Sequence, residues 1–155
     1  MSIAVETSKL IVEYLKNIVP DVEVRRSYLA VLEPDELEEL GKIALCIVPM
    51  NRNVDRYTVG NMQQNELAID ICINAKLNHC NDEHDAQVAE IDELLAFAEK
   101  IYSLFLKKVE KNSGHFRAAF NQPEHVVLCD IEAMERNCFL SVVRVNAVVL
   151  AKPEV

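Results

Sequence analysis

The chain is poor in the residues that build linkers and glycine-rich sites. Its 155 residues include three glycines, five prolines and no tryptophan. Flexible linkers need glycine, serine or proline in quantity, and a chain of this length suits one core, so we expect a single domain over residues 1–155. The patterns GxGxxG, GxxxxGK[ST], GxSxG and HExxH are all absent from the sequence. We therefore expect neither an enzyme nor a cofactor.

Paired cysteines and long apolar runs are also missing. Five cysteines occur, an odd number, and none forms a CxxC pair. Four of them lie in or beside apolar, strand-like runs, which indicates reduced thiols acting as small hydrophobic residues in a cytosol. No apolar run approaches 18 residues, and the first 19 residues lack the pattern of a signal peptide. We expect no membrane partner.

Positive charge is scarce. Sixteen Lys and Arg residues face 25 Asp and Glu residues, for a net charge of -9. Binding to nucleic-acid phosphates needs clustered cations, so DNA and RNA binding are disfavoured. The charge can serve solubility alone, or it can form an acidic wall past which nucleic acid slides without binding.

What the sequence does contain is one long amphipathic helix, expected over residues 85–109. Its apolar residues recur at steps of three and four, which is the period of a helix with one buried face. Anionic residues lie near its start and lysines near its end, as the helix dipole favours. The apolar stripe consists of Val88, Ile91, Leu94, Leu95, Ala98, Ile101, Tyr102, Phe105 and Leu106.

Strand patterns lie on both sides of this helix. Alternating apolar residues predict an α+β fold: a mostly antiparallel sheet of four to five strands, with one long and one shorter helix on one face. The shorter helix is expected at residues 5–17, and an acidic helical turn at 33–41. The expected strands are residues 22–29, 42–50, 66–77, 125–131 and 138–150, with a loop at 112–122.

Residues 51–65 read as a long polar hairpin loop between two strands. A structureless loop of that length is unusual in a compact domain, so either the strands continue into it or it has a function. Cations and an aromatic residue gather there, a mixture typical of protein contacts. The predicted contact residues are Arg52, Asp55, Arg56, Tyr57, Gln63 and Gln64.

Three weaker constellations could carry chemistry. His79, Cys80 and His84 could hold zinc in a small cytosolic metal-dependent hydrolase, although their spacing matches no zinc motif. Cys80 beside His79 could act as a nucleophile, although the acidic surroundings disfavour a thiolate. Asp70 and Asp130 could meet as a pair of carboxylates. The alternative without chemistry is an acidic adaptor domain that docks on a basic partner.

The order of these elements resembles the tail terminator proteins of tailed bacteriophages and prophages, which complete the tail and join it to the head. The order is helix, strand, acidic turn, strand, long polar hairpin loop, strand, long helix and strands. The resemblance spans most of the chain and is one of pattern rather than of signature residues; a fifth strand after residue 137 departs from it. The matching stretches are 22–24, 42–49, 66–73, 88–106 and 139–145.

The resemblance implies a structural protein with no catalytic residues, cofactor or metal. It implies a homo-oligomeric ring, a hexamer, that caps the tail tube, ends its polymerisation and meets the head connector or neck protein. DNA would pass through the lumen without specific binding. The protein would be made in the cytoplasm of the bacterial host and reside in the tail or neck of the virion.

Overall fold

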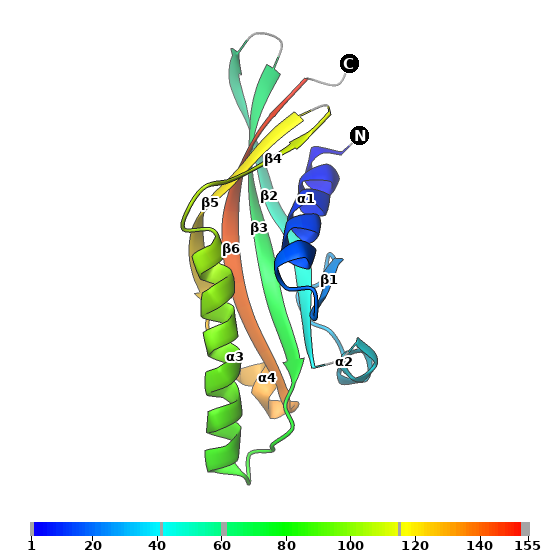
Figure 1. Cartoon of the computed structure of the whole chain (residues 1–155), viewed down its shortest axis with the longest axis vertical. Helices are drawn as coiled ribbons and strands as arrows, with labels where there is room; N and C mark the ends of the chain where they lie inside the picture. Colours follow the sequence, from blue (N-terminus) through cyan, green and yellow to red (C-terminus); the bar gives the residue numbers. More distant parts are fainter. Residues whose placement is uncertain (1, 41, 60–61, 115, 153–155) are drawn as a thin grey trace.

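The computed structural model describes residues 2–40, 42–59, 62–114 and 116–152, with the side chains at 39–40 and 55–59 outside the description (Figure 1). It is an α+β fold, as predicted. Along the chain, the elements are α1 (Ile3–Ile18), β1 (Glu23–Arg26), α2 (Pro34–Leu40), β2 (Ile43–Val59), β3 (Met62–Lys76), α3 (His84–Leu104), β4 (Val109–Ser113), β5 (Phe116–Val127), α4 (Ile131–Glu135) and β6 (Cys138–Ala151).

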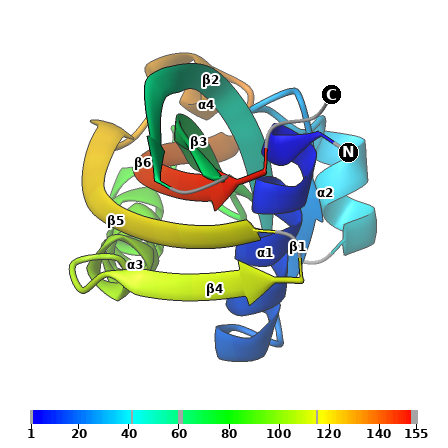
Figure 2. The same ribbon diagram turned by 90° about the horizontal axis from the view of Figure 1, so that it is seen from above.

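The strands form one mixed sheet in the order β1-β2-β3-β6-β5-β4. All neighbours are antiparallel except β1, which pairs in parallel with the first part of β2. Figure 2 shows that the sheet is strongly curled. Bulges in β2 and β5 contribute to this curl, since a bulge bends its strand and increases the local twist.

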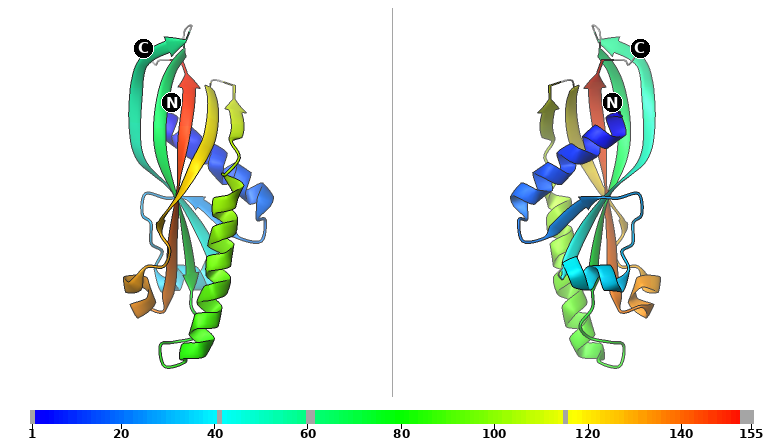
Figure 3. Two further views of the ribbon diagram at one scale, coloured as in Figure 1. Left: turned by 90° about the vertical axis from the view of Figure 1, so that its left-hand side faces the viewer. Right: turned by 90° about the vertical axis from the view of Figure 1, so that its right-hand side faces the viewer.

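Helices α1 and α3 cover one face of the sheet, which we call the inner face (Figure 3). Their buried side chains join alternate residues of the four longest strands in one apolar cluster. Tyr14 of α1 meets Phe105, the residue that follows α3, edge to face with ring centroids 5.6 Å apart. Each fully buried side chain of this size contributes about 1.5–3 kcal/mol, so this cluster is the main source of stability. Its helical members include Ile11, Leu15, Leu94, Ala98 and Ile101.

The opposite face, the outer face, carries a second and smaller cluster. Leu37 of α2 and Ala133 of α4 pack there with Leu32 against β2, β3 and β6. Asn74 fastens the segment before α2, because its amide group accepts a hydrogen bond from Leu32 N and donates one to Ala30 O. The strand residues of this cluster are Ala44, Cys46, Val48, Cys72, Cys138, Leu140 and Val142.

These two clusters show that the prediction was wrong about which faces of the sheet the helices cover. The prediction placed two helices on one face of four to five mostly antiparallel strands. The described residues form six strands, one pair of them parallel, and four helices distributed over both faces. Helix α2 confirms the acidic helical turn predicted at 33–41, whereas α4 was not predicted. α4 has a single buried residue, Ala133, so it leaves no apolar pattern in the sequence.

Two predicted loops are strands. Residues 51–59 and 62–65 continue β2 and β3, so the proposed long hairpin loop is wrong and the alternative of extended strands holds. Of the predicted loop at 112–122, residues 112–113 lie in β4 and residues 116–122 in β5; the predicted strand at 125–131 stops at Val127, and α4 begins at Ile131. Residues 51–54 are all exposed, and exposed or half-buried residues alternate with buried ones from 116 to 120, so the sequences of these parts resemble loops.

The long helix is shorter than predicted at its C-terminal end. It ends at Leu104, and the chain turns before entering β4 at Val109. Phe105 lies beyond the helix and is fully buried, whereas Leu106 is 62% exposed. The helical spacing of Leu106 in the sequence was therefore coincidental.

Replacement of Phe105 and Leu106 by alanine tests this helix end. We expect Phe105→Ala to lower the free energy of unfolding by about 3–5 kcal/mol, because it opens a cavity and removes the partner of Tyr14. Leu106→Ala should change it by less than about 0.5 kcal/mol, as is usual for exposed positions. Urea unfolding followed by circular dichroism measures both. Equal effects of the two replacements would contradict the observed helix end.

Candidate functional site

The first predicted contact residue, Arg52, is committed to a neighbour on β3. Its Nε and Nη2 atoms both donate to Asn65 Oδ1, at 3.1 and 2.8 Å. Asn65 is fully buried, and its Nδ2 atom donates to Gln63 O at 3.4 Å. A buried amide needs such partners, so Arg52 stabilises the end of the β2–β3 hairpin. Only the interruption of an apolar alternation by Asn65 could have pointed to this role.

The other predicted contact residues lie around the same hairpin. Gln63 and Gln64 are half-buried on β3, opposite Ala151 and Leu150 of β6. The side chains of the remaining three, Asp55, Arg56 and Tyr57, lie outside the described residues; their backbone belongs to β2. The structure therefore brings Arg52 and Gln63 together through Asn65.

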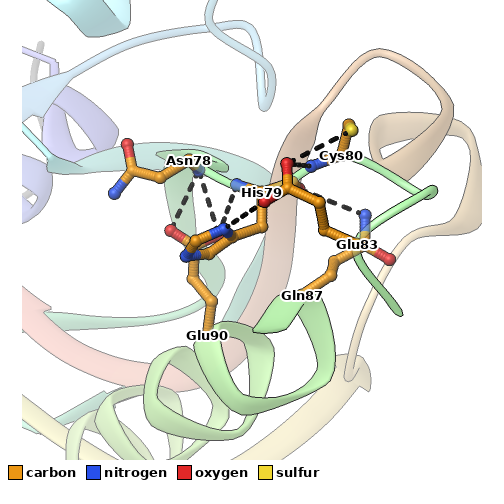
Figure 4. A network of polar contacts seen from close by, with 6 residues as sticks. All are labelled: Asn78, His79, Cys80, Glu83, Gln87 and Glu90. Carbon is orange, nitrogen blue, oxygen red and sulfur yellow. Dashed lines mark hydrogen bonds and ion pairs between the residues drawn. The ribbon is translucent and has the colours of Figure 1, made fainter. Parts of the chain in front are cut away.

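The loop between β3 and α3 is held by a buried carboxylate. Both oxygens of Glu90 accept hydrogen bonds from Asn78 N, at 2.9 and 3.0 Å, and Oε1 also accepts from His79 N at 3.2 Å (Figure 4). Gln87 Nε2 donates to His79 O and to Asn81 Oδ1. One turn of α3 thus satisfies the polar groups of the loop, which makes the loop a rigid connection.

Two of the three candidate zinc ligands belong to the same loop. His79 Nδ1 lies 3.1 Å from Glu83 Oε2, and Cys80 Sγ donates to Glu83 Oε1 at 3.4 Å. The hydrogen bond with His79, with those from Cys80, holds the pKa of Glu83 below its ordinary value. His84 is exposed at the start of α3. Among the described residues, no group of three or more His, Cys, Asp and Glu side chains is placed to hold a metal ion.

Among the described residues, the carboxylate of Asp70 pairs with Arg144 across β3 and β6 rather than with Asp130. The guanidinium donates to both carboxylate oxygens, at 2.7 and 3.1 Å. Asp70 is buried, and the pair raises the pKa of Arg144. Asp130 precedes α4 at its N-cap position. The Asp70–Arg144 pair lies where the covered half of the outer face meets an uncovered half.

That uncovered half, which we call the open face, is lined mainly by amide side chains and small apolar residues. Two shallow hollows of about 410 and 350 Å³ lie on it, formed by the curl of the sheet. The ionisable groups that line these hollows among the described residues are Lys108, Glu110, Arg117 and Glu66, and they are spread along the face rather than gathered at one point. The open face includes Asn51, Asn53, Glu66, Ala68, Arg117, Ala119, Asn121, Asn146 and Val148.

The two sides of the sheet end in strands with a free edge. β1 pairs only with Ala44–Ile47, so β2 beyond that stretch has no described strand on its outer side. At the other side of the sheet, β4 pairs with β5 alone among the described strands. Free edges present unpaired N–H and C=O groups that can join another strand.

A comparison with models of known protein families and a search of curated proteins both found no match for this chain. Among the residues that the structure describes, none of the helices has the length and apolar character that a membrane crossing requires.

Neutralising Glu90 tests its structural role. Glu90→Gln replaces one accepting oxygen by an NH₂ group that cannot accept, so we expect a loss of about 1–3 kcal/mol in the free energy of unfolding. Hydrogen exchange of the Asn78 and His79 amides should quicken. Glu93→Gln, at an exposed position of the same helix, is the matched control and should change neither quantity. Unchanged amide exchange in Glu90→Gln would contradict the role of this carboxylate.

The cysteines should differ in reactivity. Burial raises the pKa of the Cys46 thiol to about 11 and that of Cys72 to about 12, against an ordinary value of 9.0. Since only the thiolate attacks, the native protein at pH 8 should release colour with Ellman's reagent at the half-exposed Cys80 and not at these two. All five should react in denaturant. Rapid native labelling of Cys46 or Cys72, identified by mass spectrometry, would refute this.

The same raised pKa values predict a dependence of stability on pH. The unfolded thiols ionise near pH 9 and the folded ones only near 11 and 12. Their contribution to stability is therefore complete below pH 9 and declines as the pH rises above it. Urea unfolding at pH 8 and pH 10, for the native chain and Cys72→Ala, measures this: the native chain should lose more stability over that interval. An equal loss in both would contradict it.

Proposed function

We propose that this chain is the tail terminator of a tailed bacteriophage or prophage, a non-enzymatic structural protein. In this proposal identical subunits form a ring, a hexamer, that caps the tail tube and ends its polymerisation. The opposite side of the ring meets the head connector or neck protein. The protein would be made in the host cytoplasm and remain in the tail or neck of the virion.

The observation that supports this function best is the open sheet with a free edge on each of its two sides. A ring of identical subunits needs two different surfaces on each subunit, because every interface joins one surface to the other. Free edges on opposite sides of one sheet provide two such surfaces. A closed barrel or a fully covered sheet would not.

Exposed apolar side chains add to this support. Tyr28 and Leu29 follow β1, and Leu128 and Ile131 flank the start of α4; these four are 56–73% exposed. Large apolar residues at the surface are typical of interfaces with other proteins. The two pairs lie near different strands of the sheet, as a ring with distinct contacts on each subunit would need.

The charge of the chain fits a passage for DNA. The net charge of -9 repels phosphates, and α3 contributes an exposed row of acids that includes Asp85, Asp92, Glu93 and Glu99. If such a surface lines the lumen, DNA can slide past it without specific contacts. The negative charge would then serve the passage of DNA and not only the solubility of the protein.

The purified protein should assemble, alone or on tail tubes. Light scattering at rising protein concentration should reveal particles several times heavier than the 17.6 kDa chain, and negative-stain electron microscopy should show rings or capped tubes. Tubes polymerised in its presence should stop at a defined end. A protein that stays monomeric at every concentration and leaves tube growth unchanged would refute the proposed function.

A further inference from the structure

We propose that the interface between ring subunits is a continuation of the sheet, in which β4 of one copy pairs with the free edge of β2 in the next copy. The β2 segment concerned is residues 51–54, which we call the docking segment. This inference rests on the proposed ring and adds the surface that closes it. The partner is a second copy of this chain.

The docking segment is a short regular stretch between two irregularities. Residues Asn51–Val54 pair in register with Ala68–Asn65 of β3, and the register shifts on both sides of this stretch. Its outer edge carries no described strand. The neighbouring Met50 is 51% exposed and Val54 is 45% exposed, so apolar surface would be buried by a strand laid along this edge.

The other partner, β4, has a matching length. It contains five residues, against four in the docking segment. In an antiparallel pair, alternate residues turn their main-chain groups toward the partner strand. We take the last pair of the register with β5, Ser113↔Phe116, to be hydrogen-bonded, so that residues 109, 111 and 113 turn their main-chain groups toward β5. Glu110 and Asn112 turn theirs toward the free edge and can bond to a further strand.

Strand direction is consistent with a ring. Three antiparallel steps lead from β2 through β3 and β6 to β5, and a fourth leads to β4, so β2 and β4 run in the same direction within one subunit. Rotation about an axis along the strands preserves direction, so β4 would lie parallel to β2 of the next copy. Near its N-terminal end, at Ala44–Ile47, the outer edge of β2 already pairs with a parallel strand, β1.

Charge favours this pairing over two β4 strands meeting each other. The approach to β4 and the strand itself carry Lys107, Lys108 and Lys111 against the single acid Glu110, a net charge of +2 in a chain of net charge -9. Lys108 is ion-paired with Glu110 at 3.0 Å, and Lys111 lies over the ring of Tyr14, 5.2 Å from its centroid. Two such cationic edges would place like charges side by side, which is destabilising. The docking segment contains one cation, Arg52, which is already bonded to Asn65.

Disulfide trapping tests the pairing directly. Asn53 and Asn112 both line the open face, so cysteines at these positions would come together in the proposed interface. We expect Asn53→Cys combined with Asn112→Cys to give a ladder of covalent oligomers on mild oxidation, resolved on a non-reducing gel. A second double variant, Asn51→Cys with Asn112→Cys, tests a β4–β2 register that is shifted by two residues. Each single variant and the unmodified chain, with its five native thiols, are the controls.

Each outcome separates the two proposals. A ladder in either double variant, absent in the single variants, supports the β4–β2 interface. Dimers from Asn112→Cys alone would indicate β4–β4 pairing and overturn it. No ladder in a protein that forms rings in the microscope would overturn the interface and leave the ring function standing. No ladder and no ring on tail tubes would overturn both.

A second pair of variants tests the main chain rather than the side chain. Asn112→Pro removes the N–H directed at the free edge, whereas Asn112→Ala keeps it. We expect roughly tenfold weaker association for the proline variant and little change for the alanine variant. Circular dichroism and thermal unfolding check that both fold. Equal association of the two folded variants would overturn the pairing.

Discussion

The architecture depends on a change of burial along the two central strands. In β3, residues from Ile69 to Ala75 are buried on both faces, whereas from Asn65 to Ala68 burial alternates. β6 mirrors this change, with burial on both faces from Cys138 to Val143 and alternation beyond. A sheet buried on both faces must be covered on both, and a sheet with alternating residues on one only. The position of α2 and α4, and the extent of the open face, follow from this change.

The change of burial also explains which elements the sequence reveals. β3 and the long helix carry strong apolar periods, and the sequence predicted the C-terminal end of β3 and the start of the helix within one residue, but placed the start of β3 and the end of the helix four and five residues too late. β4 and β5 carry a real alternation, Phe116, Ala118 and Phe120, which the polar residues between them and the Asn-Ser-Gly turn obscured. Where the end of β2 pairs with the start of β3, the buried residue is the polar Asn65. An apolar residue at this position would have extended the alternation and indicated that the strand continues.

The candidate site was less predictable, because its residues act through partners distant in the sequence. Arg52 is 13 residues from Asn65, and Asp70 is 74 residues from Arg144. Pattern analysis could place each residue on a strand but not choose its partner, since register across strands depends on the bulges. The histidine and cysteine of the β3–α3 loop were recognisable as polar and close together. Their use as partners of Glu83 depends on the local turn.

The free edges pose a physical problem that any assembly of this fold must solve. An unguarded edge pairs with any exposed strand, so stable proteins interrupt their edges with bulges, prolines and charges. β2 has Pro49 and two register shifts, and β4 is short and carries two charged residues, Glu110 and Lys111. These features leave only short regular stretches on which a partner strand can lie. The same interruptions that prevent indiscriminate aggregation can therefore select one partner segment. In the ring that we propose, the four regular residues between these interruptions would act as a specific docking surface rather than as an aggregation hazard.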